Sequence, residues 1–166
     1  MNFATVKSLT IPEGKVVKIT QGNRVLWQAE PESEPIVNLI DTIGYTDNNR
    51  LSTSGGGLKS NTGTFVTGMI QLEAAGDVYR TSGASFNADS NSNCGVWIYQ
   101  SNQTYWTYLN TNRSKSPISH STVGIEVDAD GNLEITSAAG FSNRWIRLCG
   151  IGSGANLIVT VNEEIK

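Results

Sequence analysis

The chain has 166 residues, which suits one ordinary domain with a small appendage, and only 16% of its residues are charged. Ser, Thr and Asn together supply 49 residues, and 12 Lys and Arg are too few for an all-helical or coiled-coil protein. A net charge of −3 without a basic cluster argues against a nucleic-acid partner, and no apolar run reaches the roughly 18 residues of a membrane span.

Residues 1–30 are predicted to form a short N-terminal β-meander. The apolar alternation in TVKSLTI, KVVKIT and RVLWQ is interrupted by Pro-Glu-Gly and Gln-Gly-Asn, which are turn sequences. Strands of this size cannot bury a core alone, so we expect the meander to serve attachment or oligomerisation. Residues 31–36, rich in Pro and Glu and without a period, are predicted to be a linker.

Residues 37–166 are predicted to form an all-β, jelly-roll-like antiparallel β-sandwich. Short apolar strands follow one another at regular spacing, and Gly, Asn or Ser separates them. No helix of ten residues or more is expected. The predicted strand segments are VNLI, TFVTGMIQL, DVYRTSG, CGVWIYQ, TYWTYL, TVGIEV, LEIT, RWIRLCGI and NLIVTVNEEI.

The sequence GIEVDADGNLEIT predicts a hairpin with a defined register. Apolar residues must face the same core, so Val127 should oppose Leu133 across a three-residue loop that ends at Gly131. The same register places Glu126 opposite Glu134 on the outer face.

That acidic pair has three interpretations. It is a solvated hairpin face, a calcium site with Asp128, Asp130 and Asn132 as ligands, or a pair of glycosidase carboxylates. The calcium alternative lacks the glycine and glutamate positions of an EF-hand loop. The glycosidase alternative needs a cleft, which a sequence does not show.

The aromatic strands CGVWIYQ and TYWTYL suggest a sugar-binding face. If Val96 and Ile98 point inward, aromatic rings lie on the opposite face, where rings can pack on sugar CH groups and amides can bond hydroxyls. The alternative is that both faces of the strands are covered by a second sheet and a subunit contact. The tentative glycan-binding residues are Trp97, Tyr99, Trp106, Tyr108, Asn102 and Gln103.

The remaining reactive side chains offer little chemistry. His120 is the single histidine, no Gly-x-Ser-x-Gly motif occurs, and a histidine-rich zinc site is impossible. Cys94 and Cys149 lie in apolar strands, so we expect buried free thiols, with a bridge possible if the strands adjoin. Arg80 is expected to pair with a carboxylate or an interface group. We therefore expect no catalytic residues and no cofactor.

Two stretches resemble tail-associated proteins of phages and prophages from gut Firmicutes. Residues 6–28 carry the pattern TIPEG, V-KI and VLW of a short segment in those proteins, and residues 41–166 resemble the β-sandwich module that often follows it. The matching residues of that module are GYTDN (44–48), RLS (50–52), VTGMI (66–70), AGDVYR (75–80) and LIVTVNE (157–163).

This resemblance implies a non-enzymatic tail or baseplate protein of a virion, assembled in the host cytoplasm. The N-terminal sequence MNFATVKSLTIPEGK lacks the apolar stretch of a signal peptide, so we expect none. The resemblance also implies tail proteins as partners, a homo-oligomer with a trimer favoured, and binding of a host cell-surface glycan. The alternatives are a carbohydrate-binding module of a bacterial glycan-handling system and a glycoside hydrolase.

Overall fold

The computed structural model describes residues 18–21, 24–28, 35–88, 94–138 and 144–165. The chain divides into two units, residues 1–35 and 36–166. In the first unit, β1 (Lys18–Gln21) and β2 (Arg24–Gln28) form an antiparallel pair with a bulge. The first predicted strand of the meander, TVKSLTI, and most of the predicted linker lie outside the described residues.

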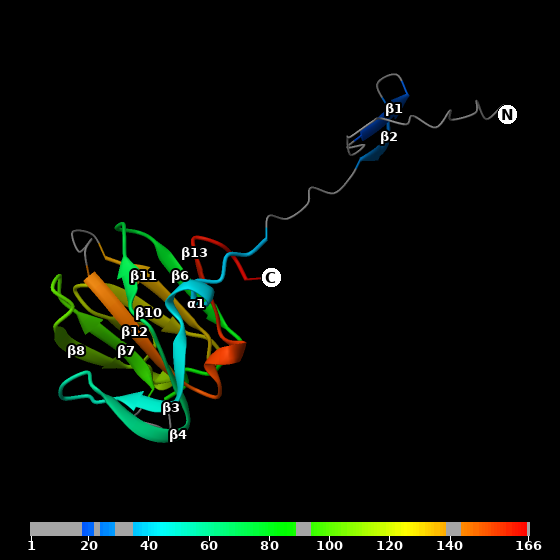
Figure 1. Cartoon of the computed structure of the whole chain (residues 1–166). Helices are drawn as coiled ribbons and strands as arrows, with labels where there is room; N and C mark the ends of the chain where they lie inside the picture. Colours follow the sequence, from blue (N-terminus) through cyan, green and yellow to red (C-terminus); the bar gives the residue numbers. More distant parts are fainter. Residues whose placement is uncertain (1–17, 22–23, 29–34, 89–93, 139–143, 166) are drawn as a thin grey trace. The chain divides into compact units, whose positions relative to one another are not determined.

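The second unit is a sandwich of two antiparallel sheets (Figure 1). The five-stranded sheet has the order β13-β6-β11-β10-β9, and the six-stranded sheet has the order β3-β4-β12-β7-β8, with β5 also paired to β12. This confirms the predicted β-sandwich, while the jelly-roll arrangement of its connections stays a prediction. The strands of the five-stranded sheet are β6 (Val78–Ser82), β9 (Ile118–Ser119), β10 (Val123–Val127), β11 (Leu133–Ser137) and β13 (Ile158–Val161).

The segment that precedes the six-stranded sheet differs from the expectation. Residues 37–40, predicted as strand, instead form a turn and the start of the helix α1 (Ile40–Ile43), because Asn38 Oδ1 accepts hydrogen bonds from the N–H of Ile40 and of Val159. Two short 3₁₀ helices, η1 (Arg113–Lys115) and η2 (Gly154–Asn156), complete the elements. The strands of the six-stranded sheet are β3 (Tyr45–Leu51), β4 (Leu58–Thr67), β5 (Ile70–Leu72), β7 (Gly95–Tyr99), β8 (Tyr105–Asn110) and β12 (Arg144–Ile151).

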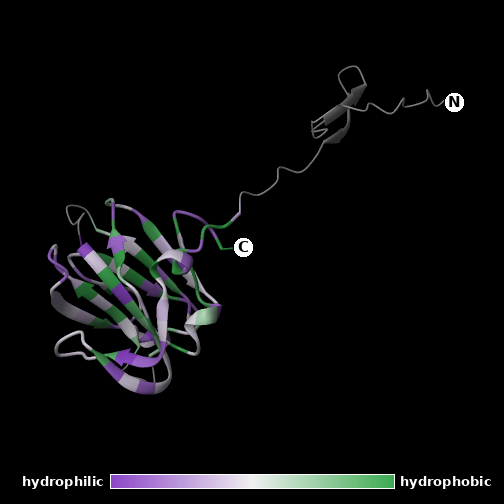
Figure 2. Ribbon diagram, in the orientation of Figure 1, coloured by the Kyte–Doolittle hydropathy of each residue, from purple (hydrophilic) through white to green (hydrophobic). Residues whose placement is uncertain are grey.

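The main core lies between the two sheets. Alternation along β10 and β11 buries every second residue, and Figure 2 shows hydrophobic and hydrophilic positions alternating along the strands. Core residues from both sheets include Phe65, Ile98, Ile125, Ile135 and Ile146. Within the described residues, no helix is long and apolar enough to cross a membrane.

The predicted hairpin register is confirmed. Val127 pairs with Leu133, and Glu126 pairs with Glu134. Gly131 has φ +88°, and its N–H donates to the carbonyl of Asp128 at 3.2 Å, as the three-residue loop requires.

Candidate functional site

The structure places two rings of the predicted sugar platform inside the protein. Trp97 is 0% exposed and Tyr99 is 4% exposed, so neither ring can contact a bound sugar. The expectation that these side chains lie on an open outer face is therefore wrong. All five residues of β7 are buried, which means that both faces of this strand are covered.

The cover comes from the glycine-rich connection between β3 and β4, not from a subunit. The indole Nε1–H of Trp97 donates to the carbonyl of Ser52 at 3.0 Å, and the Tyr99 hydroxyl donates to the carbonyl of Gly56 at 3.1 Å. The Tyr105 hydroxyl donates to the carbonyl of Thr53. Gly56 has φ +66°, and a Cβ there would lie 2.7 Å from the Tyr105 ring, so this close approach requires glycine.

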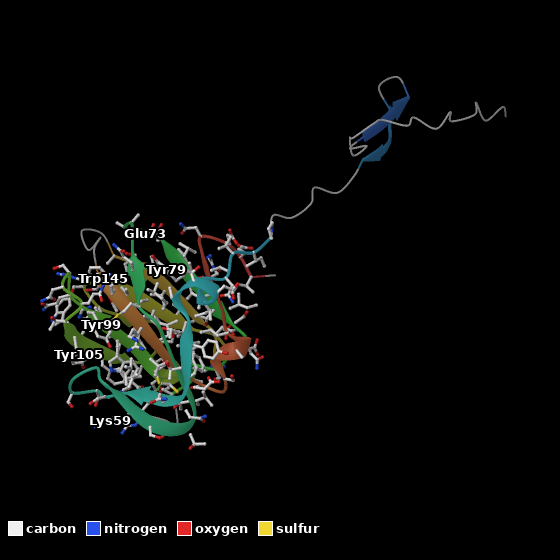
Figure 3. All side chains as sticks on the ribbon, in the orientation of Figure 1. Lys59, Glu73, Tyr79, Tyr99, Tyr105 and Trp145 are labelled. Carbon is white, nitrogen blue, oxygen red and sulfur yellow. The ribbon has the colours of Figure 1, made fainter. Side chains whose placement is uncertain are left out.

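The other candidate side chains on β8 do not complete a platform. The half-buried Tyr108 ring packs on Trp97 at 4.2 Å between ring centroids, so one of its faces is already occupied. Trp106 is 38% exposed, and its neighbours are the His120 ring at 5.2 Å and the Arg144 guanidinium at 5.5 Å. Figure 3 labels Tyr99 and shows it close to Tyr105 and Trp145 on one side of the domain.

Asn102 and Gln103 stabilise the turn between β7 and β8. Asn102 Oδ1 accepts the N–H of Thr104 at 3.1 Å, and Gln103 adopts φ +60° while its N–H donates to the carbonyl of Gln100. Both side chains are exposed. The predicted residues thus divide among a buried cluster, an edge and a turn, and they do not form one site.

The outer face of the five-stranded sheet contains a groove that we name the sheet groove. It consists of a cavity of about 420 Å³ toward the hairpin turn and an adjoining cavity of about 230 Å³. Glu126 and Glu134 line both cavities and form the centre of the floor. The lining residues are Arg80, Thr81, Ser82, Ser116, Pro117, Ile118, Ser119, Gly124, Ile125, Glu126, Val127, Asp128, Asn132, Leu133, Glu134, Thr136, Glu164 and Ile165.

The walls of the sheet groove come from distant parts of the chain. One wall is the segment 116–119, where the Ser116 hydroxyl oxygen accepts the N–H of Val127 at 3.0 Å. The other wall includes the end of the chain, where the Glu163 carbonyl accepts hydrogen bonds from Arg80 at 3.3 Å and from the Thr160 hydroxyl at 3.1 Å. The predicted strand NLIVTVNEEI is too long, because β13 ends at Val161 and Glu164 and Ile165 instead line this wall. The segment 116–119 carries no periodic or motif signal, so the sequence did not indicate its position.

The floor of the groove contains one ion pair. Arg80 Nε lies 2.9 Å from a carboxylate oxygen of Glu134, its cross-strand partner in the sheet. This confirms the expectation that Arg80 pairs with a carboxylate. Both side chains remain partly exposed, at 29% and 45%, so solvent weakens the pair.

The calcium alternative does not suit the geometry of the hairpin loop. Both carboxylate oxygens of Asp128 accept N–H groups, from the backbone of Asp130 at 2.8 Å, and from the backbone and side chain of Asn132 at 2.9 and 2.8 Å. Burial alone would raise the pKa of Asp128, but these hydrogen bonds and one from Gly131 lower it overall. Among the described residues, no group of three or more His, Cys, Asp or Glu side chains could hold a metal ion.

The thiols and the histidine do not line the sheet groove. Cys94 and Cys149 are buried free thiols, as expected. Burial, together with the neighbouring Cys149, raises the pKa of Cys94 to about 12, and burial raises the pKa of Cys149 to about 11, so both stay protonated at neutral pH. His120 Nδ1 accepts the N–H of Thr122 at 3.1 Å, and burial lowers the pKa of this imidazole.

Comparisons with protein-family models, with curated proteins and with solved structures give no match to this chain.

Proposed function

We propose that this protein is a non-enzymatic tail or baseplate component of a phage virion that binds a glycan of the host cell surface in the sheet groove. The observation that carries the glycan proposal is the groove itself. Its volume of about 420 Å³ lies in the range of small-ligand sites, and the adjoining cavity extends it along the strands.

The chemistry of the groove suits polyhydroxylated ligands. Carboxylates, a guanidinium and the hydroxyls of Ser82, Ser116 and Ser119 offer both donors and acceptors to sugar hydroxyls. No Trp, Tyr or Phe lies among the described residues that line it. A site without ring stacking binds one glycan weakly, so useful affinity requires several copies acting together.

The virion context rests on the sequence resemblance. In this proposal the N-terminal unit attaches the protein to other tail or baseplate proteins and supports a homo-oligomer, with a trimer favoured. An oligomer presents several sheet grooves to one cell surface, which raises avidity without new contacts. A carbohydrate-binding module of a bacterial glycan-handling system would use the same groove on a different carrier.

Hydrolysis by Glu126 and Glu134 is a second candidate, because both carboxylates line the same groove. Two carboxyl groups beside one glycosidic bond are what a glycosidase needs. However, Glu134 already forms an ion pair with Arg80, which competes with the general-acid role. We therefore favour binding without hydrolysis.

The proposal is tested on a glycan array and by calorimetry with a variant that blocks the groove. Thr136 is exposed and lines the groove, and Gln71 is an exposed strand residue of the six-stranded sheet that does not line it. We expect Thr136→Trp to weaken glycan binding at least about tenfold, and Gln71→Trp to leave it unchanged, with both variants folded by circular dichroism.

Two outcomes would contradict the proposal. Equal binding by Thr136→Trp and the unsubstituted protein, or no binding to any glycan, would remove the groove as a glycan site. Release of reducing sugar that disappears in Glu126→Gln would replace the binding proposal with the hydrolase alternative.

A further inference from the structure

The charges that line the sheet groove are unbalanced. Among the described residues that line it, Glu126, Asp128, Glu134 and Glu164 carry carboxylates and Arg80 carries a guanidinium. We propose that the groove takes an oligosaccharide of basic amino sugars, whose free ammonium groups meet these carboxylates. This inference rests on the proposed function and specifies its ligand class.

The first step of the argument is the contact between like charges. Glu126 and Glu134 are direct cross-strand partners, and like charges in that position destabilise a sheet. Of the two carboxylates, Arg80 bonds that of Glu134: its Nε donates to it at 2.9 Å, and its Nη1 donates to the carbonyl of Glu163. In the part of the chain that the structure describes, no ion pair or hydrogen bond involves the Glu126 carboxylate.

The second step concerns what kind of group can reach Glu126. Its side chain is exposed and lines both cavities, so a ligand in either cavity can approach it. An ammonium group offers three donors and a positive charge, which offsets the repulsion between Glu126 and Glu134. A ligand with carboxylate or phosphate groups would add to that repulsion.

The third step concerns length. The groove follows β10 and β11 from residue 132 to residue 136 on the second strand, a span of about 13 Å at about 3.3 Å per residue. The Glu126–Glu134 pair lines both cavities, so a ligand that occupies both passes these carboxylates in its middle portion. Such a ligand has more than one sugar ring.

The deciding experiment compares two ligand series with the same backbone. Glucosamine oligomers carry free amines, and N-acetylglucosamine oligomers of the same lengths carry none. By calorimetry with the full chain at low salt, we expect the amine series to bind at least about tenfold more tightly than the acetylated series. Within the amine series, we expect oligomers to bind more tightly than the monosaccharide. The advantage over the acetylated series should shrink between about 0.01 M and 0.15 M salt, as the Debye length falls from about 30 Å to about 8 Å.

Matched variants separate the groove from the overall charge. Glu126→Gln keeps the shape of the side chain, and Glu73→Gln removes the same charge from an exposed position outside the groove. We expect glucosamine oligomers to bind about three- to fivefold more weakly to Glu126→Gln. We expect their binding to Glu73→Gln to be unchanged.

Each outcome decides a different claim. Equal affinity for the two series, or equal weakening by both variants, would overturn the ammonium inference. The groove would remain a glycan site if Thr136→Trp still weakens binding at least about tenfold. If other glycans on the array bind and glucosamine oligomers do not, the ammonium inference is likewise overturned and the groove remains a glycan site. Failure of every glycan to bind would remove the proposed function itself.

Discussion

Replacing Trp97 by alanine is expected to lower the free energy of unfolding by about 4 kcal/mol. The side chain is 0% exposed, and truncation of a buried aromatic residue costs about 3–5 kcal/mol through lost burial and a residual cavity. The variant also loses the hydrogen bond from Nε1–H to Ser52, a contribution of about 1 kcal/mol. The Ser52 carbonyl keeps the Gly56 N–H at 2.8 Å, so no buried acceptor is left unsatisfied and the total stays within the usual range.

Trp106→Ala is the matched control on the neighbouring strand. Its side chain is 38% exposed, and its ring contacts are with His120 and Arg144. Loss of an edge-on aromatic contact and an exposed cation–π contact costs about 1 kcal/mol. The pair of variants therefore measures whether a tryptophan of the aromatic strands belongs to the core or to the surface.

Urea unfolding of the full chain, followed by far-ultraviolet circular dichroism, provides the measurement. With a slope of about 2 kcal/mol per molar urea, Trp97→Ala should lower the midpoint by about 2 M and Trp106→Ala by about 0.5 M. If Trp97→Ala costs no more than Trp106→Ala and weakens glycan binding instead, the burial argument fails. In that case the interpretation of Trp97 as part of an outward sugar-binding face would replace the burial argument.

Two further predictions concern the thiols and the hairpin turn. Cys94 and Cys149 should resist a thiol reagent at pH 8 until the protein unfolds, because burial raises their pKa values to about 12 and about 11. Since the unfolded thiols have a pKa near 9.0, these groups hold protons more tightly when folded, and stability should fall as the pH rises above 9.0. Gly131→Ala should cost about 2 kcal/mol in urea unfolding, because φ is +88° and the new Cβ would lie 2.5 Å from Ser85 Oγ. Gly124→Ala, with nothing within 4 Å and no positive φ, should change stability by less than about 0.5 kcal/mol, and equal losses in the two variants would contradict the assigned turn.

The hairpin could be predicted because its information is local. Val127 and Leu133 must share a core face, and only one loop length satisfies that condition together with Gly131 at a positive φ. The same reasoning placed Glu126 opposite Glu134 without any knowledge of the rest of the sheet. The β-sandwich could also be predicted, because it depends on the spacing of short strands and on the turn residues between them.

The position of Trp97 could not be predicted because it depends on a distant segment. Alternation showed that the two faces of its strand differ, but not whether the outer face meets solvent. The structure covers it with the connection that begins at Ser52, which lies 45 residues earlier in the chain. The glycine-rich sequence of that connection was visible, but nothing in it indicated which strand it would cover.

The positions of the buried threonine hydroxyls favour the proposal that the sheet groove selects ligands by charge. Several of the abundant threonines are buried and bond the backbone where strand pairing ends: Thr67 Oγ1 accepts the N–H of Leu148 at 2.9 Å, and Thr81 Oγ1 accepts the N–H of Leu133 at 2.8 Å. These hydroxyls are committed to the fold and are not available to a ligand. The groove is lined by four carboxylates in a chain with 15 Asp and Glu, so under the proposed function we expect its discrimination between ligands to depend mainly on their charge. A neutral polysaccharide could use the hydroxyls that remain exposed, but it would leave the repulsion between Glu126 and Glu134 unrelieved.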